Sequence, residues 1–348
     1  MPSLRTAVVI AGCALTSLAS ALEGNAQEAP WPMAGHDPAH TGTGAGPGPP
    51  YRVAWTVENP AGGAVAAPVV AADRVIVVGR SAVVALSTAD GEVIWEEPRF
   101  EGPASDPAIA GDLVIHASGR GDRAALVARS LDDGRREWSA NLGAAVLGGP
   151  TVSGELAVAG TTDGRLVALD AASGQERWSY EGEGAFDGAP AIGDGLVVAV
   201  DNRVGDERGA VVAIDAEVGT GDGPPEWQFS PPIPGRISAP AIGEGYVAMG
   251  TAEQLIRVLG LRNGDERTSA RTRDAFAPRQ IPATGDGLIV AGAAHVSRID
   301  PETGDETWTF QLADLRPLQD GRYNTLIAAS PVVIGDVVLI GDGAGGLS

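Results

Sequence analysis

The sequence contains no lysine, one cysteine and only four histidines. All 24 positive side chains are therefore arginines, and they face 45 aspartates and glutamates. Because binding to phosphates needs a basic face, this balance argues against nucleic acid as a partner. An acidic surface without lysine suggests a salt-loving host, although a GC-rich genome alone also removes lysine codons.

The single cysteine, Cys13, cannot form an internal disulfide. It lies in residues 1–26, which have the pattern of an export signal. Arg5 supplies the positive start, residues 7–18 are apolar, and residues 19–21 or 24–26 offer a small-residue cleavage site. In the alternative reading, residues 10–13 form a lipoprotein box and Cys13 becomes the lipidated N-terminus. Either way, the mature protein is predicted to be exported, as a periplasmic, extracellular or cell-surface protein.

Long apolar runs are also lacking. After the first 26 residues, no stretch approaches the ~20 apolar residues that a membrane-spanning helix requires. Attachment to a membrane is therefore expected only through a lipid on Cys13.

Aromatic residues make up only 5% of the chain, but the tryptophans are regularly placed. Six of the seven recur at steps of roughly 40–50 residues with one double step, a spacing typical of propellers and solenoids. They are Trp55, Trp95, Trp138, Trp178, Trp227 and Trp308. Prolines that open short apolar runs have the same period: Pro68, Pro107, Pro150, Pro190, Pro240, Pro282 and Pro331. Seven prolines predict seven structural units.

Each unit is predicted to be a small antiparallel sheet of four strands. In the clearest copy, residues 148–178, the alternation over 155–159 indicates a half-buried strand and residues 162–164 form a hairpin turn. A returning strand, a turn over 170–174 and an outer strand with Trp178 follow. Since such sheets cannot bury both faces alone, they stack radially. We therefore expect an all-β, seven-bladed propeller over residues 51–348, with 27–50 as a lead-in and Gly/Pro-rich linker.

The stretch ALDAASGQERW, residues 168–178, resembles the A-x-D-x-x-x-G-x-x-x-W docking pattern of the PQQ-like, quinoprotein-type β-propeller family. The family includes propellers of the outer-membrane assembly-factor kind, and WPMAGHDPAHTG from Trp31 is similar to its lead-in. The resemblance implies that the tryptophans pack blade against blade, helped by turn residues Gly91, Gly134, Gly174, Gly304, Asp170, Asp215 and Asp300. Ser87, Ser130 and Gly260 replace the aspartate, Thr268 replaces a tryptophan, and residues 219–227 carry an insertion. These matches predict a fold and not a reaction.

The two ends of the repeat region are atypical. Tyr51–Glu58 resembles the outer strand of a unit and is predicted to close the ring beside the final unit. That unit begins at Ser330 and ends at GDGAGGLS, one strand short of the other copies. Either the sequence is a fragment of a longer reading frame, which would allow eight blades, or the last blade has an exposed edge. We favour the fragment.

A few groups of residues suggest chemistry, and each has a simpler explanation. His36 and His40 are separated by Pro38 and lack a third ligand, so we interpret them as loop residues and not zinc ligands. Four residues crowd one loop without the spacing of an EF-hand, which favours a solvated acidic turn over a calcium site. They are Asp201, Asn202, Asp206 and Glu207.

The remaining candidates are weaker still. His116 and His295 are isolated in the sequence, and Arg120-Gly121-Asp122 is interpreted as a chance adhesion tripeptide in a charged hairpin. Gly341, Gly343 and Gly346 match a phosphate-binding glycine pattern, but no helix follows, so a hairpin turn explains them better. No catalytic, cofactor-binding or metal-binding residue is assigned.

Two functions from different classes follow. The first is a non-enzymatic scaffold that binds an unidentified protein partner, as the resemblance to assembly-factor lipoproteins implies, with no cofactor expected. The alternative is a quinoprotein dehydrogenase with PQQ and calcium over the central channel. Its relatives of that kind are much longer and many carry a vicinal cysteine pair, which this sequence lacks. A polysaccharide-binding or adhesion module is disfavoured by the aromatic-poor loops.

Overall fold

The structure is a computed structural model. It describes residues 31–46, 53–58, 61–62, 66–103, 105–203, 208–221, 223–233, 235–251, 253–273, 281–292, 295–311 and 330–340. Cys13, the predicted signal peptide, Asp206, Glu207 and the glycines of 341–346 lie outside these ranges. The only helix in the described ranges is a 3₁₀ turn, η1 (Gly121–Arg123), and none is long and apolar enough to cross a membrane.

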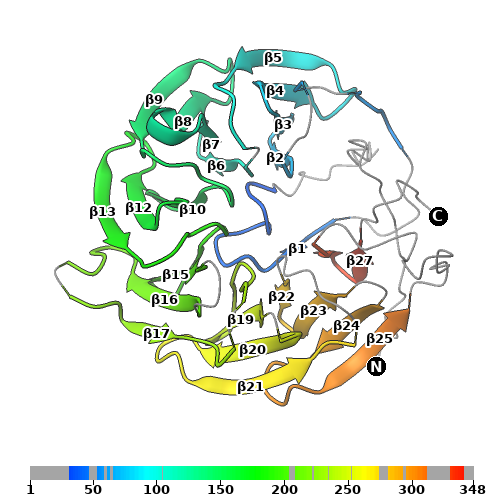
Figure 1. The fold of residues 1–348 in the computed structure, drawn as a ribbon. Coiled ribbons are helices and arrows are strands. Elements are labelled where there is room, and N and C mark those ends of the chain that lie inside the picture. The colour runs from blue at the N-terminus through cyan, green and yellow to red at the C-terminus, as the bar shows by residue number, and fades with distance from the viewer. Residues whose placement is uncertain are drawn as a thin grey trace, which may run out of the picture.

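The described strands form seven sheets arranged as blades around an axis, which confirms the expected all-β, seven-bladed propeller (Figure 1). Blades 1 to 6 each have four consecutive antiparallel strands, from the centre to the rim. Blades 1 to 3 comprise β2 (Val69–Ala71), β3 (Arg74–Val78), β4 (Ala82–Ser87), β5 (Val93–Pro98); β6 (Ala108–Ala110), β7 (Leu113–Ser118), β8 (Ala125–Ser130), β9 (Arg136–Asn141); and β10 (Thr151–Ser153), β11 (Leu156–Gly160), β12 (Arg165–Asp170), β13 (Glu176–Glu181).

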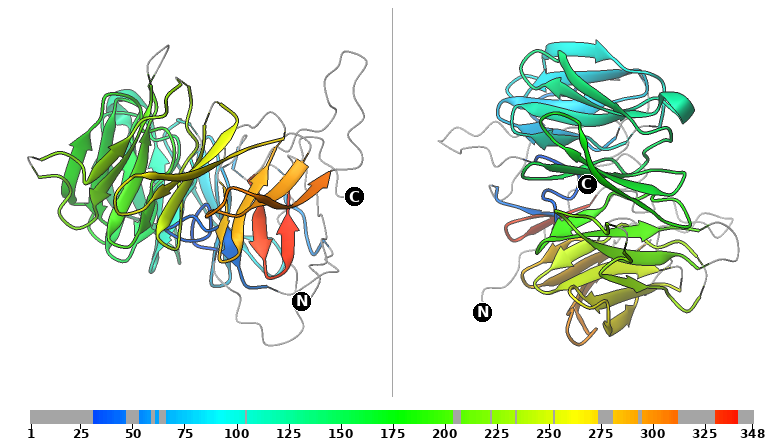
Figure 2. Two further views of the ribbon diagram at one scale, coloured as in Figure 1. Left: turned by 90° about the horizontal axis from the view of Figure 1, so that it is seen from below. Right: turned by 90° about the vertical axis from the view of Figure 1, so that its left-hand side faces the viewer.

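Blades 4 to 6 repeat the arrangement on the other half of the ring. They comprise β14 (Ala191–Gly193), β15 (Leu196–Asp201), β16 (Ala210–Asp215), β17 (Trp227–Phe229); β18 (Ala241–Gly243), β19 (Tyr246–Thr251), β20 (Leu255–Gly260), β21 (Glu266–Arg271); and β22 (Ala283–Thr284), β23 (Gly287–Ala291), β24 (His295–Ile299), β25 (Glu306–Gln311). In the described residues, blade 7 has three strands: β26 (Val332–Ile334), β27 (Val337–Leu339) and, from the N-terminal side, β1 (Thr43–Gly44). The side views show the sheets standing against one another around the ring (Figure 2).

The two middle strands of a blade are buried on both faces. All five residues of β11 are buried, so the prediction of a half-buried strand over 155–159 is wrong. The reason is that a neighbouring blade covers each face of the sheet, and a strand covered twice needs an apolar residue at every position. The outer strand β13 behaves differently, because Trp178 is its one buried residue.

Each docking tryptophan is tied to the next blade through one hydrogen bond. The indole Nε1 donates to a backbone carbonyl oxygen in five places: Trp55 to Thr88 at 2.9 Å, Trp95 to Leu131 at 2.9 Å, Trp138 to Ala171 at 3.0 Å, Trp178 to Ala216 at 3.0 Å and Trp227 to Leu261 at 2.7 Å. The indole face lies on a turn glycine. At Gly174, which has φ +70°, a Cβ would lie 2.5 Å from Cε3 of Trp138, so only glycine fits.

The turn aspartates shape the turns on which these tryptophans dock. The carboxylate Oδ1 of Asp170 accepts from the amide of Ser173, and Asp215 and Asp300 accept from amides two and three residues further on. In the variant copies, a serine hydroxyl accepts in the same way, as Ser87 does from Ala89. Such side-chain turns explain why short polar residues precede each glycine.

Ring closure differs from the expectation in one respect. Trp55 docks on blade 1 as an outer-strand tryptophan would, but residues 53–58 form no strand. The N-terminal strand that pairs with blade 7 is instead β1, which runs parallel to β26 and adds to the central edge of the sheet. Residues 53–58 therefore lack the predicted strand, and the place of Tyr51–Glu58 beside the final unit stays a prediction.

Candidate functional site at the hub of the ring

The N-terminal segment 31–46, here called the hub segment, fills the centre of the ring, where it is the blue trace in Figure 1. Five inner strands donate an equivalent amide, two residues after the blade's proline, to its carbonyl oxygens. The pairs are Val70 to Trp31 at 2.8 Å, Ile109 to Pro32 at 2.7 Å, Ile192 to Pro38 at 2.6 Å, Ile242 to Ala39 at 2.7 Å and Val333 to Gly42 at 2.8 Å. The segment thereby satisfies strand edges that would otherwise line the channel unpaired.

His40 is the centre of this arrangement and is only 1% exposed. Its Nδ1 lies 3.0 Å from the carbonyl oxygen of Pro240, which can only accept, so Nδ1 carries the proton in the neutral ring. Its Nε2 lies 3.3 Å from the hydroxyl of Thr151, which in turn lies 2.6 Å from the carbonyl oxygen of Pro190. Complete burial lowers the pKa of His40 to about 4. His40 and Thr151 together thus connect blades 3, 4 and 5.

The backbone of the hub segment turns tightly to reach every blade. His36 and His40 have φ of 75° and 60°, a left-handed conformation that non-glycine residues seldom adopt. The Asp37 carboxylate accepts from the amide of Thr41 at 3.0 Å and from its hydroxyl. Gly42 faces blade 6, where a Cβ would lie 2.8 Å from Cβ of Pro282. The interpretation of His36 and His40 as loop residues holds for their backbone, but the burial of His40 was not predicted.

His116 also has a structural place, between blades 1 and 2. It is fully buried on β7, its Nδ1 lies 3.0 Å from the carbonyl oxygen of Ala117, and its Nε2 accepts from Nε of Arg129 at 3.3 Å. Burial, with smaller contributions from Arg129 and Arg99, lowers its pKa to about 3. His295 begins β24 of blade 6, and Arg120–Asp122 lies at η1 on the surface.

The acidic loop after β15 is not a solvated turn in its described part, so that prediction is wrong for Asp201 and Asn202. Both side chains are buried. Asp201 accepts from the amide of Glu183 at 3.0 Å, and Asn202 donates to Asp187 at 2.8 Å and to the carbonyl oxygen of Ile237 at 3.1 Å. The connections entering blades 4 and 5 fold over this loop and supply these partners.

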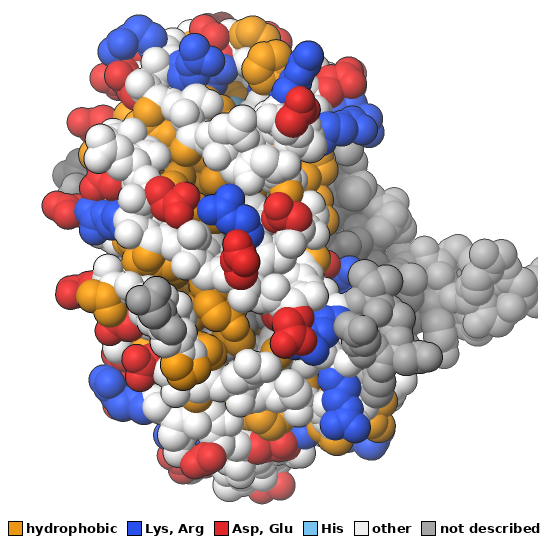
Figure 3. Space-filling model, turned by 60° about the vertical axis from the view of Figure 1, so that its left-hand side comes forward, with side chains coloured by type: hydrophobic (Ala, Val, Ile, Leu, Met, Phe, Trp, Pro, Cys, Tyr) orange, Lys and Arg blue, Asp and Glu red, His pale blue; other side chains and the backbone are white. Residues whose placement is uncertain are grey.

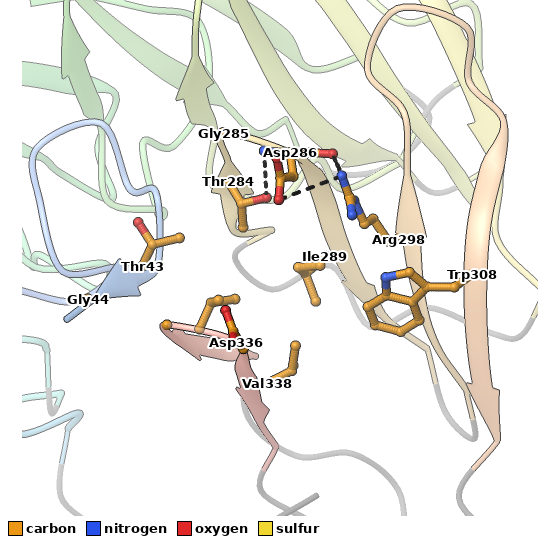
Figure 4. A pocket seen from close by; sticks show the side chains of 12 residues that line it. Thr43, Gly44, Thr284, Gly285, Asp286, Ile289, Arg298, Trp308, Asp336 and Val338 are labelled. Atoms are coloured by element: carbon orange, nitrogen blue, oxygen red, sulfur yellow. Dashed lines mark hydrogen bonds and ion pairs between the residues drawn. The ribbon is translucent and has the colours of Figure 1, made fainter. Parts of the chain in front are cut away.

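A cavity of about 410 Å³ lies between blades 6 and 7, and Thr43 and Gly44 at the end of the hub segment are part of its lining (Figure 4). Its apolar lining includes Trp308 and Val338. Its polar lining is largely paired internally, because Nε of Arg298 donates to the carbonyl oxygen of Asp286 at 2.7 Å and the amide of Asp286 donates to Thr284 at 3.3 Å. Nε1 of Trp308 is buried and has no hydrogen-bond partner among the residues that the structure describes.

The hub does not fit calcium-bound PQQ. Calcium takes six to eight oxygen ligands, with carboxylates prominent among them. Within the described part of the chain, no three His, Cys, Asp or Glu side chains come together as a metal site. The hub instead presents backbone carbonyls that already accept from the blades, and the buried imidazole of His40 beside Thr151. We therefore derive no reaction through the cofactor.

A ring of repeated four-stranded blades, joined by tryptophans that dock on glycine turns, defines a PQQ-like β-propeller. The family model described as "Outer membrane protein assembly factor BamB" matches residues 51–144, 122–280 and 221–348. The chain belongs to this family.

Known relatives include both enzymes and non-enzymes. The chain is 29% identical to a quinohemoprotein alcohol dehydrogenase of Comamonas testosteroni over 52% of this chain and 27% of that protein. It is 25% identical to the outer membrane protein assembly factor BamB of Nitrosomonas eutropha over 49% of this chain and 40% of that protein. The chain thus spans well under half the length of the curated relatives that it matches.

The solved structures show the same fold. A europium-containing methanol dehydrogenase superposes with a TM-score of 0.53 at 14% identity, covering 90% of this chain and 61% of that one. At this identity the similarity concerns architecture alone.

Proposed function

We propose that the protein is an exported, non-enzymatic β-propeller scaffold that binds a protein partner at the cell surface or in the cell envelope. The observation that favours this function is the occupied hub: the chain's own backbone lies on the axis and its polar groups are paired with the blades. Binding is then left to the faces and the rim of a rigid ring, as is common for loops on a stable scaffold. Membership of the assembly-factor family supports a scaffold role.

One face of the ring is the better candidate for the partner. Phe100, Leu147 and Ile233 are large, exposed apolar residues in the connections that follow the outer strands β5, β9 and β17. Because equivalent strands point the same way in every blade, these connections share one face. Along the side of the ring in Figure 3, acidic and arginine side chains are interspersed, with smaller groups of hydrophobic side chains between them.

Crosslinking in the native envelope tests this proposal. The triple substitution Phe100→Ser, Leu147→Ser and Ile233→Ser is expected to reduce the yield of the main crosslinked partner at least about tenfold, because each Ser removes apolar contact area at the interface. Exposed substitutions should leave the stability of the ring nearly unchanged. The matched control is Val218→Ser, an exposed residue in the turn before β17 on the opposite face. A triple variant that captures the wild-type partner in full yield would contradict the assignment of this face.

The second candidate is a quinoprotein dehydrogenase, favoured by the identity with the Comamonas enzyme. We expect no saturable heat when PQQ and calcium are titrated into the folded protein in high salt, because the hub presents paired backbone groups and no cluster of carboxylates was found in the described residues. One-to-one binding at micromolar or tighter affinity would overturn the scaffold proposal and justify assays with alcohols.

A further inference from the structure

The connection between blades 1 and 2 holds an exposed phenylalanine between two turns. Phe100 is 62% exposed and lies two residues after β5. Its amide donates to the hydroxyl of Ser118 at 3.1 Å, and its carbonyl oxygen accepts from the amide of Gly119 at 3.1 Å. The amide of Arg99, one residue earlier, donates to the carbonyl oxygen of Ser81 at 2.9 Å. These bonds fix the connection to the β3–β4 turn on one side and to the β7–β8 turn on the other.

Both turns carry arginines whose charge is not neutralised within the described part of the chain. Arg80 lies in the β3–β4 turn, and Arg120 and Arg123 lie in the β7–β8 turn. All three are exposed, and their side chains make no ion pair or hydrogen bond with a described residue. By contrast, an arginine such as Arg177 lies 2.6 Å from a carboxylate oxygen of Asp170. The turns beside Phe100 therefore present cations that are free to meet an anion.

One arginine of the same connection is buried and has no carboxylate partner among the described residues. Arg99 is 8% exposed, and its guanidinium donates to the carbonyl oxygens of Gly79 and, at 2.8 Å, of Pro103. Its Nε is buried and has no partner in the described ranges. A buried cation without a counter-ion is costly, and in poorly solvated surroundings it attracts a nearby anion more strongly than it would in water.

These residues form what we call the arginine corner, whose charge is opposite to that of the whole protein. The corner consists of Arg80, Arg99, Phe100, Arg120 and Arg123. Glu101 and Asp122 are the carboxylates of the same three segments, 79–81, 99–101 and 119–123, whereas the chain as a whole has a net charge of −21. On the opposite face, each of the seven turns that join the first two strands of a blade carries one exposed carboxylate and no arginine. These carboxylates belong to Asp73, Asp112, Glu155, Asp194, Glu244, Asp286 and Asp336.

We infer that the arginine corner binds an acidic segment of the partner, in which carboxylates stand beside an apolar side chain. The carboxylates accept hydrogen bonds from the guanidinium groups of Arg80 and Arg120, and the apolar side chain packs on Phe100. A short segment is held by charges within a Debye length of about 8–10 Å, whereas an extended anionic membrane is repelled by the net charge of −21. The inference specifies the chemistry of the partner on the face that carries Phe100, so it rests on the proposed function.

Calorimetric titration of the full chain with two capped peptides tests this inference. The acidic peptide GDEFDEG is expected to bind saturably at about 0.15 M salt. Its amide counterpart GNQFNQG has nearly the same shape without the charge, so it should bind at least about fivefold more weakly. Raising the salt to about 1 M shortens the Debye length to about 3 Å, and the difference between the two peptides should shrink.

A double variant locates the binding site. Arg80→Gln with Arg120→Gln removes two free cations, so affinity for the acidic peptide should fall about threefold to tenfold while affinity for the amide peptide is unchanged. The matched control is Arg262→Gln with Arg267→Gln, which removes two exposed arginines of blade 5. The control should bind the acidic peptide with the affinity of the wild type.

Three results would overturn the inference: no saturable binding of the acidic peptide, equal affinity for the two peptides, or wild-type affinity in the double variant of the arginine corner. Binding to phosphatidylglycerol vesicles that this double variant abolishes, without a preference between the peptides, would assign the corner to a membrane instead. If the triple substitution at Phe100, Leu147 and Ile233 still reduces the crosslinked partner in these cases, the scaffold proposal stands and only the chemistry assigned to the partner fails.

Discussion

Replacing Trp178 with alanine is expected to lower the free energy of unfolding by about 3–5 kcal/mol. The side chain is 8% exposed and packs with Val158, Phe186 and Ile192 between blades 3 and 4. Its removal opens a cavity at a blade interface and leaves the carbonyl oxygen of Ala216 without its donor. Guanidinium chloride unfolding in high salt, followed by circular dichroism, measures the loss.

Trp308→Ala is the matched control for that prediction. It is the same substitution at the same place in the repeat, but the indole there makes no hydrogen bond within the described part of the chain and is only half-buried. We expect a loss of no more than about 2 kcal/mol, since no hydrogen bond is lost and less apolar area returns to water. Equal losses in the two variants would mean that docking on the next blade contributes little to the stability of the ring.

The blades were predictable because their specification is local and repeated. Trp178, Gly174 and Asp170 stand at fixed offsets in one strand–turn–strand unit, and each has a physical task that the residue type reveals. The glycine adopts a positive φ, and the aspartate accepts from turn amides. The tryptophan covers the turn glycine of the next blade. Copies that lack one of these residues could still be aligned by the others.

The hub was not predictable from the sequence, because its contacts are neither local nor repeated. Its contacts join His40 to Pro240, 200 residues away, and most of its hydrogen bonds use backbone groups, which leave no mark on residue type. The same holds for Asn202, whose amide bonds to the backbone of Ile237. The one sequence signal for the hub segment was the similarity of the stretch from Trp31 to a family lead-in. That similarity did not show where the segment lies in the ring.

Two buried histidines make the ring sensitive to acid. The folded pKa of His40 is lowered to about 4 and that of His116 to about 3, in both cases mainly by burial, whereas an unfolded histidine titrates near 6.5. Above pH 6.5 both states hold a neutral imidazole and stability is unaffected. As the pH falls below 6.5 the unfolded chain binds protons that the folded ring does not, so stability is lost down to each folded pKa. Asp37 opposes the shift at His40, and Arg129 and Arg99 reinforce it at His116.

Between pH 7.5 and pH 4.5, we expect each histidine to remove roughly 2.5 kcal/mol of stability, or about 5 kcal/mol together. Denaturant titrations at several pH values in this range measure the loss. His40→Asn keeps a donor for the carbonyl of Pro240 but does not titrate, so its loss should be about half that of the wild type. Comparing the two chains cancels other groups, including Asp201, whose pKa burial raises and whose effect has the opposite sign. An unchanged pH dependence in His40→Asn would show that protons reach the hub without opening the ring.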